Sequence, residues 1–196
     1  MKLISNIVLI AILMMLTVQL APSQDKAAEK NSATGFRKDF LNQLKGVEEK
    51  IMGLAEAIPQ ESYTWRPMEG VRSVSEVFMH IAGSNYLLIS FTGVKPPAGL
   101  DKEDDNSITD KAKIILALKH SFAFTRDAVS GIPDADLDNP AKFFGTPTTV
   151  RDVIFQTALH MHEHMGQMIA YARSNKIVPP WTAAEQAAEQ KKAEKK

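Results

Sequence analysis

The 196-residue chain contains no cysteine. This absence excludes disulfides, thiolate metal ligands, thiol nucleophiles and a lipid anchor on cysteine. An excess of one charge is also lacking, because 23 Lys and Arg residues balance 23 Asp and Glu residues. A chain without a net positive field is a poor candidate for binding nucleic acid or an anionic membrane surface. Any metal site in this chain must therefore use histidine, carboxylates and water.

Long apolar runs are scarce, and the one that is present lies at the N-terminus. Lys2 precedes an unbroken apolar run over residues 7–16, and small residues follow at Ala21 and Ser23. This order is typical of a signal peptide, and we expect cleavage after Ser23 because Pro22 disfavours a cut after Ala21. An uncleaved anchor is the alternative, although this stretch is slightly short for a membrane span. We therefore expect an exported protein, periplasmic or secreted, with no membrane attachment after cleavage.

The rest of the chain divides into three parts by composition. Residues 24–34 are polar and aperiodic, which is typical of a linker. Residues 35–178 carry the apolar residues of one domain, and residues 179–196 form a polar tail that begins with two prolines. From residue 182 onwards this tail has no large apolar side chain, so a helix there would have nothing to bury.

Apolar residues within the domain recur at steps of three and four, which predicts amphipathic helices. Ser73 with Glu76 forms a capping box before the second helix, Ser107 is a plausible cap for the third, and Thr149 caps the fourth. Prolines, glycines and aspartates over 134–148 predict a long irregular connection, and no alternating strand pattern competes. The sequence thus predicts an all-α four-helix bundle. The four predicted helices span about 35–58, 74–91, 107–130 and 149–174.

Three of the five histidines lie within five residues of the fourth helix. His160 and His164 are one turn apart on the same face, about 40° apart around the axis, whereas His162 points roughly 200° away from His160. Two imidazoles at this spacing are a common way to present nitrogens to one metal ion. Exposed histidines occur at the same spacing without a metal, so the pair alone is weak evidence.

His80 on the second helix supplies context for this pair. It is surrounded in sequence by Phe78, Met79 and Ile81, and a histidine among apolar residues must find a partner. One interpretation is a core or rim histidine with its hydrogen bonds satisfied. The other is a third metal ligand that faces the fourth helix across the bundle, as metal sites in bundles commonly do.

Three motifs, in this order along the chain, resemble the DinB-like family of metal-binding four-helix bundles. They are Trp65-Arg66-Pro67 before the second helix, His80 within it, and His160 to Gln167 in the fourth, and the resemblance covers about residues 35–173. It implies that His80, His160 and His164 bind a divalent ion such as zinc, nickel, iron or manganese, with water completing the coordination. The chain departs from the family pattern at Arg72, where a tryptophan is usual, and in its signal peptide, which is not typical of the cytosolic thiol transferases in the family.

Three histidines leave at least one coordination position open, which indicates catalysis or ligand capture rather than a closed structural site. We therefore expect a metal-dependent hydrolase or transferase acting on an unknown small-molecule substrate outside the cytoplasm. A non-catalytic metal-binding or stress-related binding protein is the alternative, so whether the chain is an enzyme stays open. Bundles of this kind often dimerise, which leaves a homodimer as a further expectation.

Other polar residues near the histidines have two interpretations each. Glu76 could orient a ligand or act as a base, but its capping role is sufficient reason for it. Gln156 and Gln167 flank the histidine pair at offsets of four and three and could contact the site or the substrate. Tyr63 and Trp65 could wall the metal pocket, although aromatic residues beside a proline more often close a core.

The remaining candidates are expected to be structural. Gly166 is interpreted as allowing close helix packing. His120 is expected to lie on the surface, and His162 and Glu163 are expected to face solvent or the loop. The three methionines of the fourth helix are interpreted as a core stripe, since imidazole and carboxylate ligands do not indicate a copper site; they are Met161, Met165 and Met168.

Overall fold

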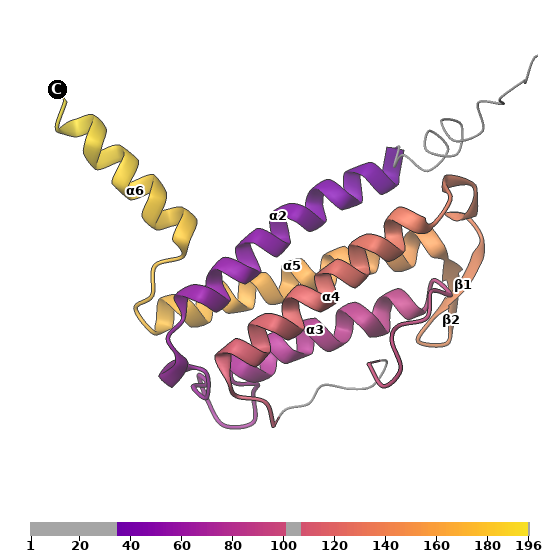
Figure 1. Ribbon diagram of the computed structural model, residues 1–196, viewed down its shortest axis with the longest axis horizontal. Helices are drawn as coiled ribbons and strands as arrows, with labels where there is room; N and C mark the ends of the chain where they lie inside the picture. The colour runs from indigo at the N-terminus through magenta and orange to yellow at the C-terminus, as the bar shows by residue number, and fades with distance from the viewer. Residues whose placement is uncertain (1–34, 101–106, 196) are drawn as a thin grey trace, which may run out of the picture. The chain divides into compact units, whose positions relative to one another are not determined.

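The computed structural model describes residues 35–100 and 107–195. The predicted signal peptide (1–23) and linker (24–34) lie outside the described residues, as do residues 101–106. Four long helices form the bundle that the sequence predicts, so the all-α fold class is confirmed (Figure 1). They are α2 (Gly35–Ala57), α3 (Val74–Ser90), α4 (Lys111–Gly131) and α5 (Val150–Ser174).

Each of these helices packs mainly on two others: α2 and α3 both pack against α4 and against α5. The backbone N–H of Lys111, at the start of α4, donates to Gln60 Oε1, just beyond the end of α2, at 2.7 Å. Tyr171, near the end of α5, donates to the backbone of Arg72 just before α3. These contacts make α4 antiparallel to α2, and α5 antiparallel to α3. Because Arg151 at the start of α5 lies over the ring of Phe36 at the start of α2, α2 and α5 run parallel.

The directions of the remaining pair follow, since α3 and α4 must also run parallel to each other. Parallel neighbours cannot be joined by a tight turn, and residues 91–110 separate the end of α3 from the start of α4. Chain order did not predict this topology. It places α3 and α5, the two helices that carry the candidate ligands, side by side.

Side-chain caps determine where three of the helices begin. The predicted capping box is confirmed: Ser73 accepts from the Glu76 amide, and the Glu76 carboxylate accepts from the Ser73 amide at 2.7 Å. Thr149 caps α5 as predicted. The predicted start of the third helix at Ser107 is wrong, because the cap of α4 is Asp110, whose carboxylate accepts from Lys113 N at 2.9 Å. The preceding Thr109 carbonyl is instead engaged by Gln60 Nε2.

The connection predicted to be irregular contains a β-hairpin. Strands β1 (Pro140–Phe143) and β2 (Thr146–Thr149) pair antiparallel across Phe144 and Gly145, which have φ of 47° and 85°. Two positive φ values are the signature of a type I′ turn, which matches the twist of a hairpin. The prolines that argued against a strand do not break the ladder, because Pro140 and Pro147 both fall in the non-hydrogen-bonded pairs of this register.

The core of the bundle lies between the four long helices. Its largest fully buried side chains include Phe78, Phe122, Leu44 and Ile154, which come from all four. A further helix, α6 (Pro180–Ala193), begins with Pro180 beside Gly53 of α2 and Trp181 against the core, and is exposed from Ala183 onwards. Over the described residues, no helix is both long and apolar enough to cross a membrane.

Candidate metal centre

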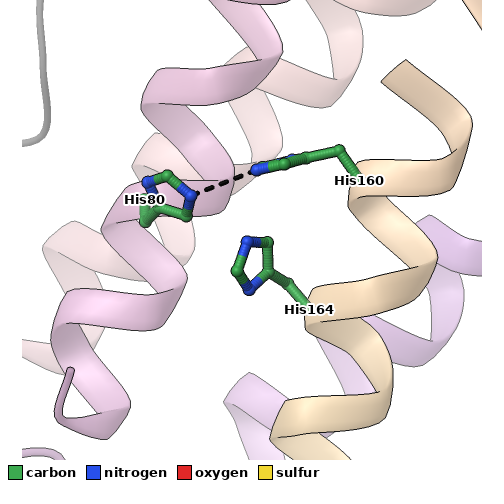
Figure 2. Close-up of side chains that lie close together, drawn as sticks. All are labelled: His80, His160 and His164. Carbon is green, nitrogen blue, oxygen red and sulfur yellow. Dashed lines mark hydrogen bonds between the residues drawn. The ribbon is translucent and has the colours of Figure 1, made fainter. Parts of the chain in front are cut away.

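The structure brings His80, His160 and His164 together. His80 lies near the middle of α3, and the other two lie one turn apart in the middle of α5, on the face that packs against α3. Figure 2 shows the three rings pointing toward one another across the two antiparallel helices. All three residues are partly rather than fully buried. Within the described chain they form the group of residues able to hold a metal ion.

The spacing of the ring nitrogens fits a divalent metal ion. One nitrogen from each ring lies within 4.8 Å of the others, and His80 Nε2 and His160 Nε2 are 3.1 Å apart. Tetrahedral metal–nitrogen bonds of about 2.0–2.1 Å place neighbouring nitrogens about 3.3 Å apart. The nitrogens of this cluster therefore need only small movements to share one ion. No carboxylate belongs to the group, which makes it a neutral donor set.

The electrostatics of the cluster favour the neutral imidazoles that metal binding requires. Burial lowers the pKa of His164 below its ordinary value, and electrostatic interactions with His80 and Arg72 lower it further. The hydrogen bond to Gln167 and the charge of Glu163 oppose this shift in the pKa of His164. A histidine that resists protonation keeps a lone pair available to a metal at neutral pH.

Of the two glutamines that flank the histidine pair, one contacts it. Gln167 Oε1 lies 2.8 Å from His164 Nδ1. Gln156 instead donates weakly to Asp152 Oδ1 at 3.4 Å, one turn back along the same helix. The sequence placed both glutamines near the site by their offsets, and the structure gives only Gln167 a hydrogen bond to a histidine of the cluster.

Tyr171 and the backbone of Arg72 are part of this network, and sequence reasoning missed the tyrosine. Gln167 Nε2 donates to the Tyr171 hydroxyl at 3.0 Å, and that hydroxyl donates to the Arg72 carbonyl at 3.0 Å. The signal for Tyr171 was available, because it continues the helical stripe of His160, His164 and Gln167 at a step of four. An apolar ring near the end of a helix is usually interpreted as core, which explains why it was passed over.

The two aromatic residues of the preceding loop behave differently. Trp65 packs edge-on against Tyr171, with ring centroids 5.4 Å apart, so it supports the network rather than the histidines directly. Tyr63 is fully buried, and its hydroxyl donates to the Ala55 carbonyl at 2.6 Å. Burial, and then the nearby charge of Glu56, raise the pKa of Tyr63 far above its ordinary value. Tyr63 is therefore a core residue and does not wall the site.

Glu76 is engaged by its capping role. Its carboxylate accepts from the Ser73 amide and from Arg66 Nη2, the latter at 2.9 Å. The hydrogen bond from the Ser73 backbone, followed by contacts with Arg66, lowers the pKa of Glu76 although partial burial opposes it. A carboxylate held in this way is a poor general base, which favours the structural interpretation of this residue.

The other sequence-derived candidates lie outside the cluster. His120, His162 and Glu163 are exposed, as predicted, and His162 Nδ1 lies 2.9 Å from the Ala158 carbonyl. Met161 and Met168 are fully buried in the core, with Met165 packed against it. The prediction that Gly166 allows close helix packing is wrong, because nothing lies within 4 Å of the position where its Cβ would be.

A hollow of about 550 Å³ lies elsewhere, between the ends of α3 and α4 and the base of the hairpin. Its lining includes Asp127, Asp136 and Asn139 but none of the clustered histidines. It offers no comparable convergence of ligand atoms. The histidine cluster is the better candidate for chemistry.

The fold and the cluster can be compared with known proteins. A family model described as the DinB superfamily matches residues 43–168, a range that contains all three histidines. No curated protein sequence matches the chain at a significant level.

Three solved structures share the fold. A DinB-like protein from Bacillus cereus ATCC 10987 is 22% identical with a TM-score of 0.65, over 73% of this chain and 95% of that one. A DinB-like protein from Bacillus subtilis, YjoA, is 18% identical with a TM-score of 0.56, over 71% of this chain and 93% of that one. YfiT from Bacillus subtilis, described as a probable metal-dependent hydrolase with an unusual four-helix bundle topology, is 14% identical with a TM-score of 0.59, over 75% and 92%.

Proposed function

The chain belongs to the DinB superfamily, and from this premise we propose that it binds a divalent metal ion through His80, His160 and His164 and acts as a metal-dependent hydrolase or transferase on a small molecule. One observation carries the proposal: three imidazoles from two helices converge with their nitrogens within 4.8 Å. The description of YfiT as a probable metal-dependent hydrolase adds support from a protein of the same fold.

The residues of this chain have separate roles in the proposed site. His80, His160 and His164 would hold the ion with neutral nitrogens, and all three are partly rather than fully buried. The hydrogen bond between Gln167 Oε1 and His164 Nδ1, 2.8 Å long, orients the ring of His164. A divalent ion held in this way acts as a Lewis acid and activates water. Zinc, nickel, iron and manganese all accept imidazole ligands, and the donor set does not choose among them.

The rival proposal is a non-catalytic metal-binding protein, in which the ion only braces α3 against α5. A bracing site should be sealed by side chains, whereas the three histidines here are partly exposed. This exposure favours the enzyme. Turnover by the metal-loaded protein distinguishes the two proposals, because a bracing site binds the ion without hydrolysing any substrate.

The experiment that tests metal binding is elemental analysis of protein purified without chelators and without a histidine tag. The wild type is compared with the double variant His80→Ala, His160→Ala. We expect about one divalent ion per chain in the wild type and none in the variant, with far-UV circular dichroism showing that both are helical. Wild-type protein that is metal-free and takes up no added zinc, nickel or manganese would sink the proposal. A panel of ester, amide and phosphoester substrates then tests the hydrolase.

We further propose that the chain acts outside the cytoplasm. The support is the sequence of residues 1–23 and the absence of cysteine, which suits an oxidising compartment. Expression of the full chain in a bacterial host, followed by fractionation and N-terminal sequencing, tests this. We expect periplasmic or secreted protein that starts at Gln24, and cytoplasmic protein with an intact N-terminus would contradict it.

A further inference from the structure

We propose that Gln167 and Tyr171 are positioning residues which, together with the backbone carbonyl of Arg72, fix the single proton of neutral His164 on Nδ1 and leave Nε2 free to bind a metal ion. The proposal rests on the proposed metal site for its purpose, but the proton position is a property of the metal-free protein. It can therefore be tested on its own.

The direction of each hydrogen bond follows from the atom at the far end. The carbonyl oxygen of Arg72 can only accept, so the Tyr171 hydroxyl, 3.0 Å away, donates its one proton there. The Tyr171 oxygen then has no proton left for Gln167 and can only accept from it. The Gln167 atom 3.0 Å away must therefore be the donor of its amide, Nε2. This orientation turns the amide oxygen Oε1 toward His164 Nδ1 at 2.8 Å. An amide oxygen cannot donate, so Nδ1 must carry the hydrogen.

The opposite orientation of the Gln167 amide would require two hydroxyl protons from Tyr171, which has one. With the amide reversed, its oxygen would face the Tyr171 hydroxyl and would need a donated proton. The hydroxyl has only one proton, and the Arg72 carbonyl already requires it. The amide orientation is thus set by chemistry at the end of the network, and the tautomer of His164 follows from it.

Packing holds the parts of this network in place. His164, Gln167 and Tyr171 follow at steps of three and four and so share one face of α5. Tyr171 is 7% exposed and meets the edge of Trp65, which limits rotation of its ring. Arg72 directly precedes Ser73, the cap of α3, so the accepting carbonyl is fixed at the start of the helix that carries His80.

The position of this proton decides which nitrogen of His164 can bind a metal ion. Figure 2 shows the second nitrogen of His164, the one not bonded to Gln167, on the side that faces His80 and His160. In a neutral imidazole one nitrogen carries the proton and the other a lone pair. A proton fixed on Nδ1 therefore leaves the lone pair on the nitrogen that faces the cluster. Partners of this kind typically change metal affinity by about 10–100-fold.

The first test measures the proton position directly in metal-free protein. Long-range ¹H–¹⁵N correlation spectra of ¹⁵N-histidine-labelled protein at about pH 8, well above the ordinary histidine pKa of about 6.5, distinguish the two tautomers. The spectrum of His164→Ala assigns the His164 signals. We expect the Nδ1–H tautomer in the wild type. We expect it also in Gln167→Glu, which keeps an acceptor, and a shift toward Nε2–H in Gln167→Met, which has none.

Tyr171→Phe provides a second, smaller change. It removes the hydroxyl but keeps the ring against Trp65, so Gln167 becomes free to reverse and both tautomers of His164 should appear. Gln156→Met is the matched control, because Gln156 lies on the same helix but bonds to Asp152 rather than to a histidine. It should leave the spectrum unchanged. Wild-type His164 protonated on Nε2, or a Gln167→Met spectrum like that of the wild type, overturns the proposal.

The second test is zinc affinity by competition with a chromophoric chelator. Gln167→Met should weaken binding by about 10–100-fold, whereas Gln167→Glu should not. Equal losses in both variants would mean that Gln167 matters only for packing and would overturn the positioning role. If the tautomer changes as expected while the wild type binds no metal, the positioning proposal stands and the proposed function fails.

Discussion

His162 lies between the two clustered histidines of α5 in sequence, yet its side chain is exposed and its Nδ1 lies 2.9 Å from the Ala158 carbonyl. The helical period separates it from the cluster, since positions two apart point to opposite sides of a helix. Histidines two residues apart therefore point toward and away from the proposed metal site.

This difference predicts the outcome of two alanine substitutions. His164→Ala should abolish tight metal binding because it removes one of three nitrogens, whereas His162→Ala should leave the affinity within about threefold of the wild type. Isothermal titration with zinc checks both variants. Comparable losses from the two substitutions would contradict the helical-face argument, because the exposed side chain would then be a ligand.

At the residue scale, the sequence could predict the cluster but only part of its support. The spacing of His160 and His164 paired these two residues, and the family resemblance added His80. The structure brings all three together. Their binding of a metal stays a prediction. The helical stripe could place Tyr171 on the face of the cluster, but it could not reveal its role, because that role depends on the Arg72 carbonyl, 99 residues away.

The hairpin between α4 and α5 is the element that the sequence concealed. Glycine and proline were interpreted as breakers of structure, whereas Gly145 forms part of the turn and the two prolines occupy permitted positions. In a strand of four residues, the alternation of polar and apolar side chains is too short to predict a strand when two prolines indicate a loop. Short elements are thus decided by turn geometry more than by pattern.

Two glycine substitutions test this view of the turn. Gly145 has φ of 85° and open space around its would-be Cβ, so Gly145→Ala should cost about 1–2 kcal/mol of unfolding free energy through backbone strain alone. Gly46 in α2 also has open space but no left-handed φ, so Gly46→Ala should add about 0.5–1 kcal/mol. Urea denaturation measures both. Effects of the same sign would contradict the assignment of strain to the turn.

The capping box of α3 predicts a dependence of stability on pH. The pKa of Glu76 is lower in the folded chain than its ordinary value of 4.5, so its contribution is present above about pH 4.5 and is lost as the pH falls through the lowered folded pKa. At pH 7, Glu76→Gln should lose about 0.3–1 kcal/mol because the charge at the helix N-terminus is gone.

Denaturation of both proteins over a range of acid pH checks this sign. The difference between wild type and Glu76→Gln should be constant near neutral pH and should shrink once the pH falls below 4.5. Arg66 is 41% exposed in its side chain, so its ion pair with Glu76 should add little. A difference that grows on acidification would contradict the lowered pKa.

At the scale of the whole molecule, a buried arginine connects the start of α2 to the end of α4. Arg37 in the first turns of α2 is 2% exposed and pairs with Asp134, which follows α4, while its Nη1 donates to the Ser130 carbonyl at 3.0 Å. The Asp134 side chain is 41% exposed. The positive charge is therefore desolvated and its counter-charge is not.

This asymmetry predicts unequal costs for removing either partner. Asp134→Ala should cost up to about 3 kcal/mol because it removes the carboxylate that pairs with the buried Arg37 guanidinium. Arg37→Met should cost less, because methionine fills the volume and water can solvate the exposed Asp134. Chemical denaturation compares the two variants. A larger loss for Arg37→Met would mean that packing of the arginine, rather than its charge, holds these helices together.

The bundle topology was the part of the fold that could not be predicted. The periodicity of apolar residues predicted four helices, but it does not indicate in which direction each helix runs. The parallel pairing of α3 with α4 depends on long-range contacts such as those of Gln60 with Thr109 and Lys111. Since the connection over residues 91–110 is long enough to return along the bundle, both parallel and antiparallel arrangements were compatible with the sequence.

The position of the histidines on α3 and α5 has a thermodynamic consequence. His80 and His160 are 80 residues apart, so an ion that joins them closes a loop that includes all of α4 and the hairpin. Such an ion behaves as a reversible cross-link, and it binds the folded chain far better than the unfolded one. At an ion concentration about 100 times the dissociation constant, mass action would add about 2.7 kcal/mol to the unfolding free energy. The melting temperature of this protein would then report the metal supply of its surroundings, and a chelator would lower it without changing a single residue.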